Sequence, residues 1–302
     1  MACVLAATAA ASPRRTLDSQ HFMLYYDEGQ LYQAEAVRQS AEAAFLRIQG
    51  LLGWSPTDHI PIYLYSDRGE FRRDAGIKRQ ELVVGVATSA DSAIRIDASE
   101  IFASVDSIIG HELTHIFLFR YLGSAVQSLP LWMNEGLAQE AGGSPRSAAG
   151  GAVVTAYKEQ RLYRLEDLRD RFPRDDTGHV AYDEAQDVVG YLLDRGGWPR
   201  IRAVLNQLKQ GLSFEVALHQ GYGIDVRELD GAWRADVKSR ARPRVWGDIG
   251  SGLIVGAMLI ALSWGYVTVQ RKRKLQALAE APPVEDEYSA PPVWWPEDQF
   301  KV

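Results

Sequence analysis

Cysteine is almost absent from this sequence, since Cys3 is the single cysteine among 302 residues. A disulfide within the chain is therefore impossible. Zinc sites built from several cysteines and Cys-x-x-Cys redox pairs are excluded for the same reason. Any metal that the chain binds must be held by histidine, aspartate or glutamate.

Positive charge is also in short supply. Lysine and arginine together number 33 against 39 acidic residues, which gives a net charge of −6. A protein whose main partner is nucleic acid carries a basic surface, so we expect no nucleic-acid partner. The chain is 46% apolar, which is enough for one sizeable core and excludes disorder throughout.

The N-terminal residues are small and apolar. Residues 2–11 are followed by a Ser-Pro-Arg-Arg sequence, so residues 1–15 resemble the last part of a secretory signal peptide. The basic start of such a peptide is missing. We expect the chain to be exported, and a flexible N-terminal tail is the alternative.

Residues 249–270 contain no charged residue. About 20 apolar residues suffice to cross a bilayer, and Trp264 and Tyr266 lie near one end, where an aromatic belt sits. We therefore expect one transmembrane helix that contacts the lipid bilayer. A buried core helix is the alternative, and it is disfavoured because the run ends at four basic residues, 271–274.

The flanks of this span are equally basic, so charge alone does not orient it. The expected signal peptide predicts the orientation. We therefore expect a single-pass cell-membrane protein whose main domain is extracytoplasmic and whose C-terminus is cytoplasmic. Gly252 and Gly256 have the GxxxG spacing that packs two membrane helices together, which would give a homodimer. A glycine-rich composition explains the spacing as well.

Residues 271–302 begin basic and continue acidic and proline-rich, without periodicity. This composition predicts a disordered tail. Trp294 and Trp295 could dock a cytoplasmic partner, and a solvated tail or a pair of interfacial residues is the alternative.

Residues 17–240 carry the pattern of a folded domain. Apolar patterning predicts strands over 21–27, 60–66, 83–88 and 93–97, with helical spacing between the first two. After residue 100 the pattern becomes almost wholly helical. Strands followed by helices predict an α+β fold in which a sheet lobe packs on a helical lobe.

The chemistry is concentrated in an HELTH sequence that contains His111, Glu112 and His115. On a helix, positions i and i+4 share one face, so both imidazoles reach a single metal and Glu112 projects beside them. Two histidine ligands and a glutamate base are the arrangement of zinc hydrolases. The alternative, a pair of core histidines, is disfavoured because burying them without partners is costly.

A catalytic zinc needs a third protein ligand. Pro130 marks the start of a second helix, and Glu135 falls within its first turns. If this helix packs antiparallel on the first, Glu135 reaches the metal. Its apolar neighbours disfavour a solvated role, and Glu140 is a weaker candidate.

The combination of HExxH with a Trp-Met-Asn-Glu-Gly-Leu-Ala sequence about twenty residues later resembles the gluzincins, the MA clan of zinc peptidases. Thermolysin-like and aminopeptidase-N-like enzymes belong to this clan, and small bacterial peptidase MA-like domains are the most similar members. The resemblance covers 17–240. It implies a thermolysin-like catalytic domain, with His111, His115 and Glu135 as Zn²⁺ ligands and Glu112 as general base.

Peptide hydrolysis also builds an oxyanion that needs a hydrogen-bond donor. Aminopeptidase-N-like enzymes carry a tyrosine for this role at the start of a later helix, and Tyr182 is the matching position, although the Lys-Gly that follows in the family is missing. His179 is the substitute candidate. A tyrosine that only packs at a helix start is the alternative.

These enzymes also carry a Gly-x-Met-Glu-Asn strand that binds the free amino end of the substrate. The corresponding residues 84–88 contain no acid, which favours an endopeptidase. The sequence thus predicts a membrane-anchored zinc metallopeptidase acting on a peptide or protein. A non-catalytic receptor or scaffold with a structural zinc site is the alternative. The glycine-rich residues 142–151 are expected to connect two helices, with a lid over the site as the alternative.

Overall fold

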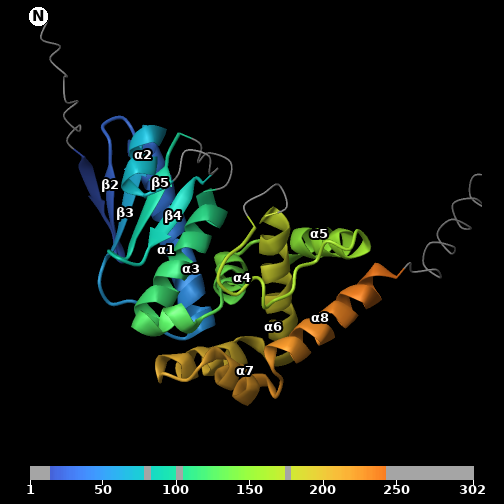
Figure 1. The fold of residues 1–302 in the computed structure, drawn as a ribbon. Coiled ribbons are helices and arrows are strands. Elements are labelled where there is room, and N and C mark those ends of the chain that lie inside the picture. Colours follow the sequence, from blue (N-terminus) through green and yellow to red (C-terminus); the bar gives the residue numbers. More distant parts are fainter. Residues whose placement is uncertain (1–13, 78–82, 100–104, 174–177, 243–302) are drawn as a thin grey trace, which may run out of the picture. The chain divides into compact units, whose positions relative to one another are not determined.

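The computed structural model describes residues 14–77, 83–99, 105–173 and 178–242 (Figure 1). Among these residues, no helix combines the length and the apolar character needed to cross a bilayer. The expected membrane span at 249–270 and the tail at 271–302 lie outside the described residues. The same holds for residues 1–13 of the expected signal peptide, whereas Arg15 begins a strand.

A mixed five-stranded sheet forms the N-terminal lobe, in the order β1-β2-β3-β5-β4. β2, β3 and β5 run parallel, while β1 and β4 are antiparallel to their neighbours at the two edges. The strands are β1 (Arg15–Asp18), β2 (Phe22–Tyr26), β3 (Ile60–Tyr65), β4 (Gly85–Thr88) and β5 (Ala93–Asp97).

One face of this sheet packs against helices α1 (Leu31–Leu52) and α3 (Val105–Leu122). Alternate residues of β2 are buried, as the period of a strand requires for a sheet with one covered face. Phe45 of α1 joins the layers, because its ring lies edge-on to both Phe22 of β2 and Phe117 of α3. This packing fixes α3, the helix of the HELTH sequence, against the sheet.

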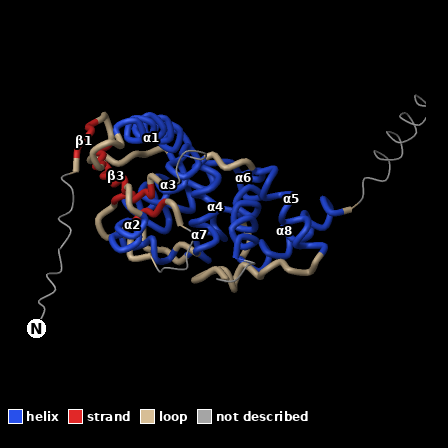
Figure 2. The backbone as a smooth tube through the Cα atoms, turned by 90° about the horizontal axis from the view of Figure 1, so that it is seen from above, coloured by secondary structure: helices blue, strands red, loops and turns tan. Residues whose placement is uncertain are grey.

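Helices and the loops that connect them make up the rest of the described chain. Figure 2 shows the strands at one end and α5, α6 and α8 at the other, with α3 and α4 between them. These helices are α2 (Arg68–Asp74), the 3-10 helix η2 (Gly123–Ser128), α4 (Leu131–Gly142), α5 (Arg146–Lys158), α6 (Gly178–Lys209), α7 (Phe214–Tyr222) and α8 (Val226–Ala241). Within α6, Gly197 adopts φ 61° and ψ −174°, which kinks the helix just before Pro199.

The predicted α+β fold is confirmed. The strand predicted at 93–97 has those bounds in β5, and β2, β3 and β4 lie within their predicted ranges. The connector expected over 142–151 is confined to residues 143–145, because α4 ends at Gly142 and α5 begins at Arg146. Ala149 of this segment is buried, so small residues there pack a helix rather than loosen a loop.

Candidate metal centre

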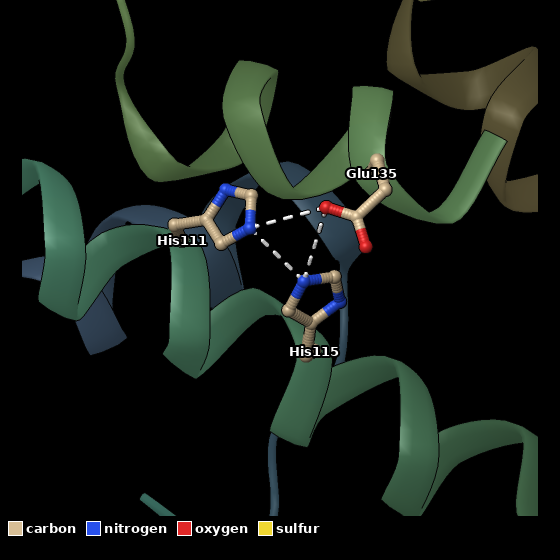
Figure 3. Close-up of side chains that lie close together, drawn as sticks. All are labelled: His111, His115 and Glu135. Atoms are coloured by element: carbon tan, nitrogen blue, oxygen red, sulfur yellow. Dashed lines mark hydrogen bonds and ion pairs between the residues drawn. The ribbon is translucent and has the colours of Figure 1, made fainter. Parts of the chain in front are cut away.

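Three potential metal ligands converge between α3 and α4 (Figure 3). His111 and His115 lie one turn apart on α3, and Glu135 projects from α4. The two Nε2 atoms are 3.1 Å apart. One carboxylate oxygen of Glu135 lies 3.3 Å from Nε2 of His111 and 3.7 Å from Nε2 of His115.

These separations fit a zinc ion. Zinc held tetrahedrally by bonds of about 2.0–2.1 Å separates its ligand atoms by about 3.4 Å. The three measured distances lie on either side of that value. A search of the described residues for three or more histidine, cysteine, aspartate or glutamate side chains that could share one metal finds this group. Two imidazoles and a carboxylate are a donor set that zinc prefers.

Glycines allow the ligand-bearing helices to come so close. A Cβ added at Gly110 of α3 would collide with the carbonyl oxygen of Gly142 on α4. A Cβ added at Gly136, next to Glu135, would collide with the carbonyl oxygen of Ala185 on α6. The contacts between α3, α4 and α6 are therefore backbone to backbone, and they set the position of Glu135 relative to the histidines.

The site is buried and charged. Burial by itself lowers the pKa of His115, but the carboxylates of Glu135 and Glu112 and the hydrogen bond to Asn134 raise it to about 9. Burial likewise raises the pKa of Glu135, but the charge of His115 and the hydrogen bonds from His111 and His115 hold it well below its usual range. Glu135 is thus kept in the anionic form that a metal ligand needs.

Asn134 orients one of the imidazoles. Nδ1 of His115 lies 3.1 Å from Oδ1 of Asn134. Because that oxygen can only accept, Nδ1 carries the proton and donates it, which leaves Nε2 as the ring nitrogen that faces the ligand group and could bind a metal. The ring of His115 also stacks on Phe119, with centroids 5.9 Å apart and planes 13° apart.

Replacing Asn134 with alanine is expected to weaken zinc affinity by about 10–100-fold, because His115 loses the partner that fixes its ring and tautomer. Competition with a chelator of known affinity measures the change. Asn134→Asp, which still accepts from Nδ1, serves as the comparison and should bind zinc more tightly than the alanine variant. Equal affinity in Asn134→Ala and the unchanged protein would contradict this role.

Glu112 faces the same cleft from α3. The residue is 9% exposed, and its carboxylate accepts a 2.7 Å hydrogen bond from the backbone N–H of Ala87 in β4. The cleft has a volume of about 740 Å³ and opens beside the metal ligands. Its lining includes Val83, Val84 and three residues of β4, together with Asn134, Gln139 and Ser144. A carboxylate, three ligand atoms and an open cleft are what hydrolysis of an extended chain requires.

The two candidate oxyanion donors differ in their position relative to the cleft. Tyr182 lines the cleft, is 44% exposed and lies edge-on to Phe172, with centroids 4.8 Å apart. Gln139, one turn beyond Glu135, donates a 2.8 Å hydrogen bond to the carbonyl of Tyr182. His179 is exposed and is not among the residues that line the cleft.

Glu140, the weaker ligand candidate, points elsewhere. Its carboxylate accepts a 2.6 Å hydrogen bond from Arg146 of α5, and it is absent from the three-residue ligand group. Asn134 and Gln139 take part in the site, although their sequence patterns did not predict it. Ala87 lies in residues 84–88, which were compared with the substrate-binding strand, but its bond to Glu112 was not predicted. For Asn134 and Gln139 a signal existed, since both sit on the helix of Glu135, one residue before it and one turn after it.

Residues 40–239 match the sequence pattern of the peptidase MA superfamily. The chain belongs to this superfamily. The resemblance to the MA clan of zinc peptidases is thereby confirmed. Membership, together with the His-His-Glu ligand set, supports a zinc-dependent hydrolase. Among curated proteins, none matches the sequence.

Solved structures of an M1 zinc metallopeptidase and of an LTA4 hydrolase are similar to this chain. An E323A mutant from Deinococcus radiodurans is 13% identical over 73% of this chain and 51% of its own, with a TM-score of 0.49. Native yeast LTA4 hydrolase is 15% identical over 72% of this chain and 38% of its own, with a TM-score of 0.47. The chain thus spans about half the length of the first protein and 38% of the length of the second.

Proposed function

We propose that this member of the peptidase MA superfamily is a zinc-dependent peptidase that cleaves internal peptide bonds. The observation that carries the proposal is the convergence of the three ligands and Glu112 in one open cleft. Metal-assisted hydrolysis of an internal amide bond needs a metal site, a base and room for a chain on both sides of the bond. The cleft provides for all three.

Each residue has a defined task in this proposal. His111, His115 and Glu135 hold the zinc ion, which supplies a Lewis acid that polarises the scissile carbonyl and makes water acidic. Glu112 takes a proton from the attacking water and passes it to the leaving amine. Tyr182 donates a hydrogen bond to the oxyanion, and His179 is the alternative donor.

Endopeptidase action is supported by β4. The strand lies at the edge of the sheet and lines the cleft, so an extended peptide can pair with it. Ala87 stands where aminopeptidase-N-like enzymes have the acid that binds the substrate's amino end, and its side chain carries no charge. Nothing in β4 therefore selects for a free amino terminus.

The competing function is a receptor or scaffold whose zinc is structural. A closed structural site takes four protein ligands. Within the described ranges the cluster offers three, which leaves room for a water and favours catalysis. The competing function predicts that a fourth side chain, such as His179, fills the remaining position.

We further propose that the peptidase domain is extracytoplasmic and is anchored by residues 249–270, with a cytoplasmic tail at 271–302. Support for the span comes from the uncharged run and its basic end, and support for the orientation comes from the signal-peptide-like residues 1–15. A cytoplasmic partner of Trp294 and Trp295, and a homodimer through Gly252 and Gly256, extend the same proposal.

The test is cleavage of casein by the full chain in detergent with zinc added. Casein is unstructured, so its segments can enter an open cleft. Cleavage that a zinc chelator stops and added zinc restores supports the proposal, and fragments cut at internal bonds support the endopeptidase type. Zinc binding without cleavage of casein or of an unbiased peptide library would favour the scaffold.

Tyr182→Phe is expected to lower kcat by about 100–1000-fold, which is the usual cost of removing one oxyanion donor. His179→Ala should change kcat by less than about threefold, because its side chain is exposed and does not line the cleft. Initial rates on one internally quenched peptide measure both variants. The reverse ranking would assign the oxyanion to His179.

A further inference from the structure

β4 exposes part of its backbone at the edge of the sheet. The N–H of Asp97 in β5 bonds to the carbonyl of Val84, and Val86 pairs with Arg95. In an antiparallel ladder the residues that exchange hydrogen bonds alternate with residues whose polar groups face away. Val84, Val86 and Thr88 therefore bond to β5, and the polar groups of Gly85 and Ala87 point to the free edge.

The free edge of β4 meets α3 at Glu112. The N–H of Ala87 donates to Oε2 of Glu112 over 2.7 Å. A Cβ added at Gly85 would lie 2.7 Å from Cγ2 of Ile108 and 3.2 Å from Cγ of Glu112. The glycine thus lets the strand approach α3 closely enough for the bond to form.

We propose that the backbone N–H of Ala87 is a positioning donor for the base. A carboxylate on a flexible side chain has several rotamers, and a charge-assisted bond to a fixed backbone donor selects one of them. The rotamer selected is one in which the other oxygen of Glu112 remains free to take a proton. This inference rests on the proposed peptidase function.

The same bond determines where a peptide strand can pair. A peptide added to β4 meets the free polar groups of Gly85, but the N–H of Ala87 is already taken by Glu112. The added ladder therefore ends at the base.

Amide hydrogen exchange of the full zinc-loaded chain tests the bond without any activity assay. In Glu112→Ala the amide of Ala87 is expected to exchange at least about tenfold faster than in the unchanged protein, because a bond to a charged acceptor is lost. Glu112→Gln keeps an acceptor oxygen and should preserve most of the protection. The amides of Val86 and Thr88 bond to β5 and serve as internal controls. An Ala87 amide that exchanges equally in the alanine variant and the unchanged protein overturns the proposal.

A second experiment tests the effect on catalysis. Ala87→Pro removes the donor at an edge position, where proline is tolerated, whereas Ala87→Gly retains it. With the base no longer oriented, kcat of the proline variant is expected to fall by about 100-fold. KM should change much less and zinc content should stay the same. The glycine variant should exceed the proline variant in kcat by at least about tenfold.

Equal kcat in the two Ala87 variants, with both folded and zinc-loaded, overturns the catalytic part of the inference. If the unchanged protein cleaves no peptide, the proposed function fails. The amide-exchange result then still decides whether Ala87 holds Glu112, so the two failures are distinguishable. Circular dichroism and zinc content identify a proline variant that does not fold, and in that case the exchange experiment alone decides.

Discussion

Glu112→Gln is expected to bind zinc normally and to lose peptide cleavage. Glutamine matches glutamate in size and can still accept the hydrogen bond from Ala87, but it cannot take a proton from water. General acid–base catalysis contributes about 100–10,000-fold, so we expect kcat to fall by about 1000-fold or more. Rates on an internally quenched peptide and zinc content by mass spectrometry measure the two properties on the same sample.

A matched control comes from the same helix. Asp106 is an exposed acid in the first turn of α3, and Asp106→Asn removes one negative charge just as Glu112→Gln does. This control should retain at least about half of the activity, because surface substitutions have small effects. Loss of zinc in Glu112→Gln would assign the residue to the metal instead of the base. Retained cleavage would exclude it as the base altogether.

Strong periodic elements were predictable from the sequence, and weak ones were not. β5 is mostly apolar, and α1 repeats apolar residues at helical spacing, so local pattern alone predicts both. β1 was missed, because three of its four residues are exposed and only pairing with β2 makes it a strand. α2 was also missed, since it is short and charged and buries only Phe71.

The candidate site follows the same rule. The spacing of His111 and His115 is local, so the sequence predicts that both face one metal. Predicting Glu135 as a ligand required a second helix packed on the first. Pro130 indicated where that helix begins, and the family resemblance indicated that its glutamate binds the metal. The bond from Ala87 to Glu112 joins residues from a strand and a helix, so no local pattern contains it. Such contacts depend on how the lobes pack.

The close helix crossings show why packing could not be read in advance. Gly110 and Gly136 look like weak points in helices, because glycine lowers helix propensity by about 1 kcal/mol. In the structure, each lies where a neighbouring backbone leaves no room for a side chain. The cost in propensity is offset by an approach of α3, α4 and α6 that no larger residue permits, and that approach brings Glu135 to the histidines.

Glu135→Ala is expected to lose zinc and, with it, both activity and metal-dependent stability. Even partners of ligands contribute 10–100-fold to metal affinity, so loss of a ligand should weaken binding by more than about 100-fold. A ligand that binds only the folded state at 1000 times its Kd stabilises it by about 4 kcal/mol. Adding zinc should therefore raise Tm of the unchanged protein, and a chelator should reverse this. In Glu135→Ala, Tm should not respond to zinc at the same concentration.

Glu140→Gln is the matched control for this experiment, because Glu140 lies on the same helix and its carboxylate bonds to Arg146 instead of the ligand group. It should keep the zinc-dependent rise in Tm, whatever its effect on Tm without zinc. A zinc response that survives in Glu135→Ala and disappears in Glu140→Gln would make Glu140, and not Glu135, the third metal ligand. Loss of the response in Glu135→Ala alone fixes the third ligand, and with three ligands the fourth position stays open for the water that Glu112 activates.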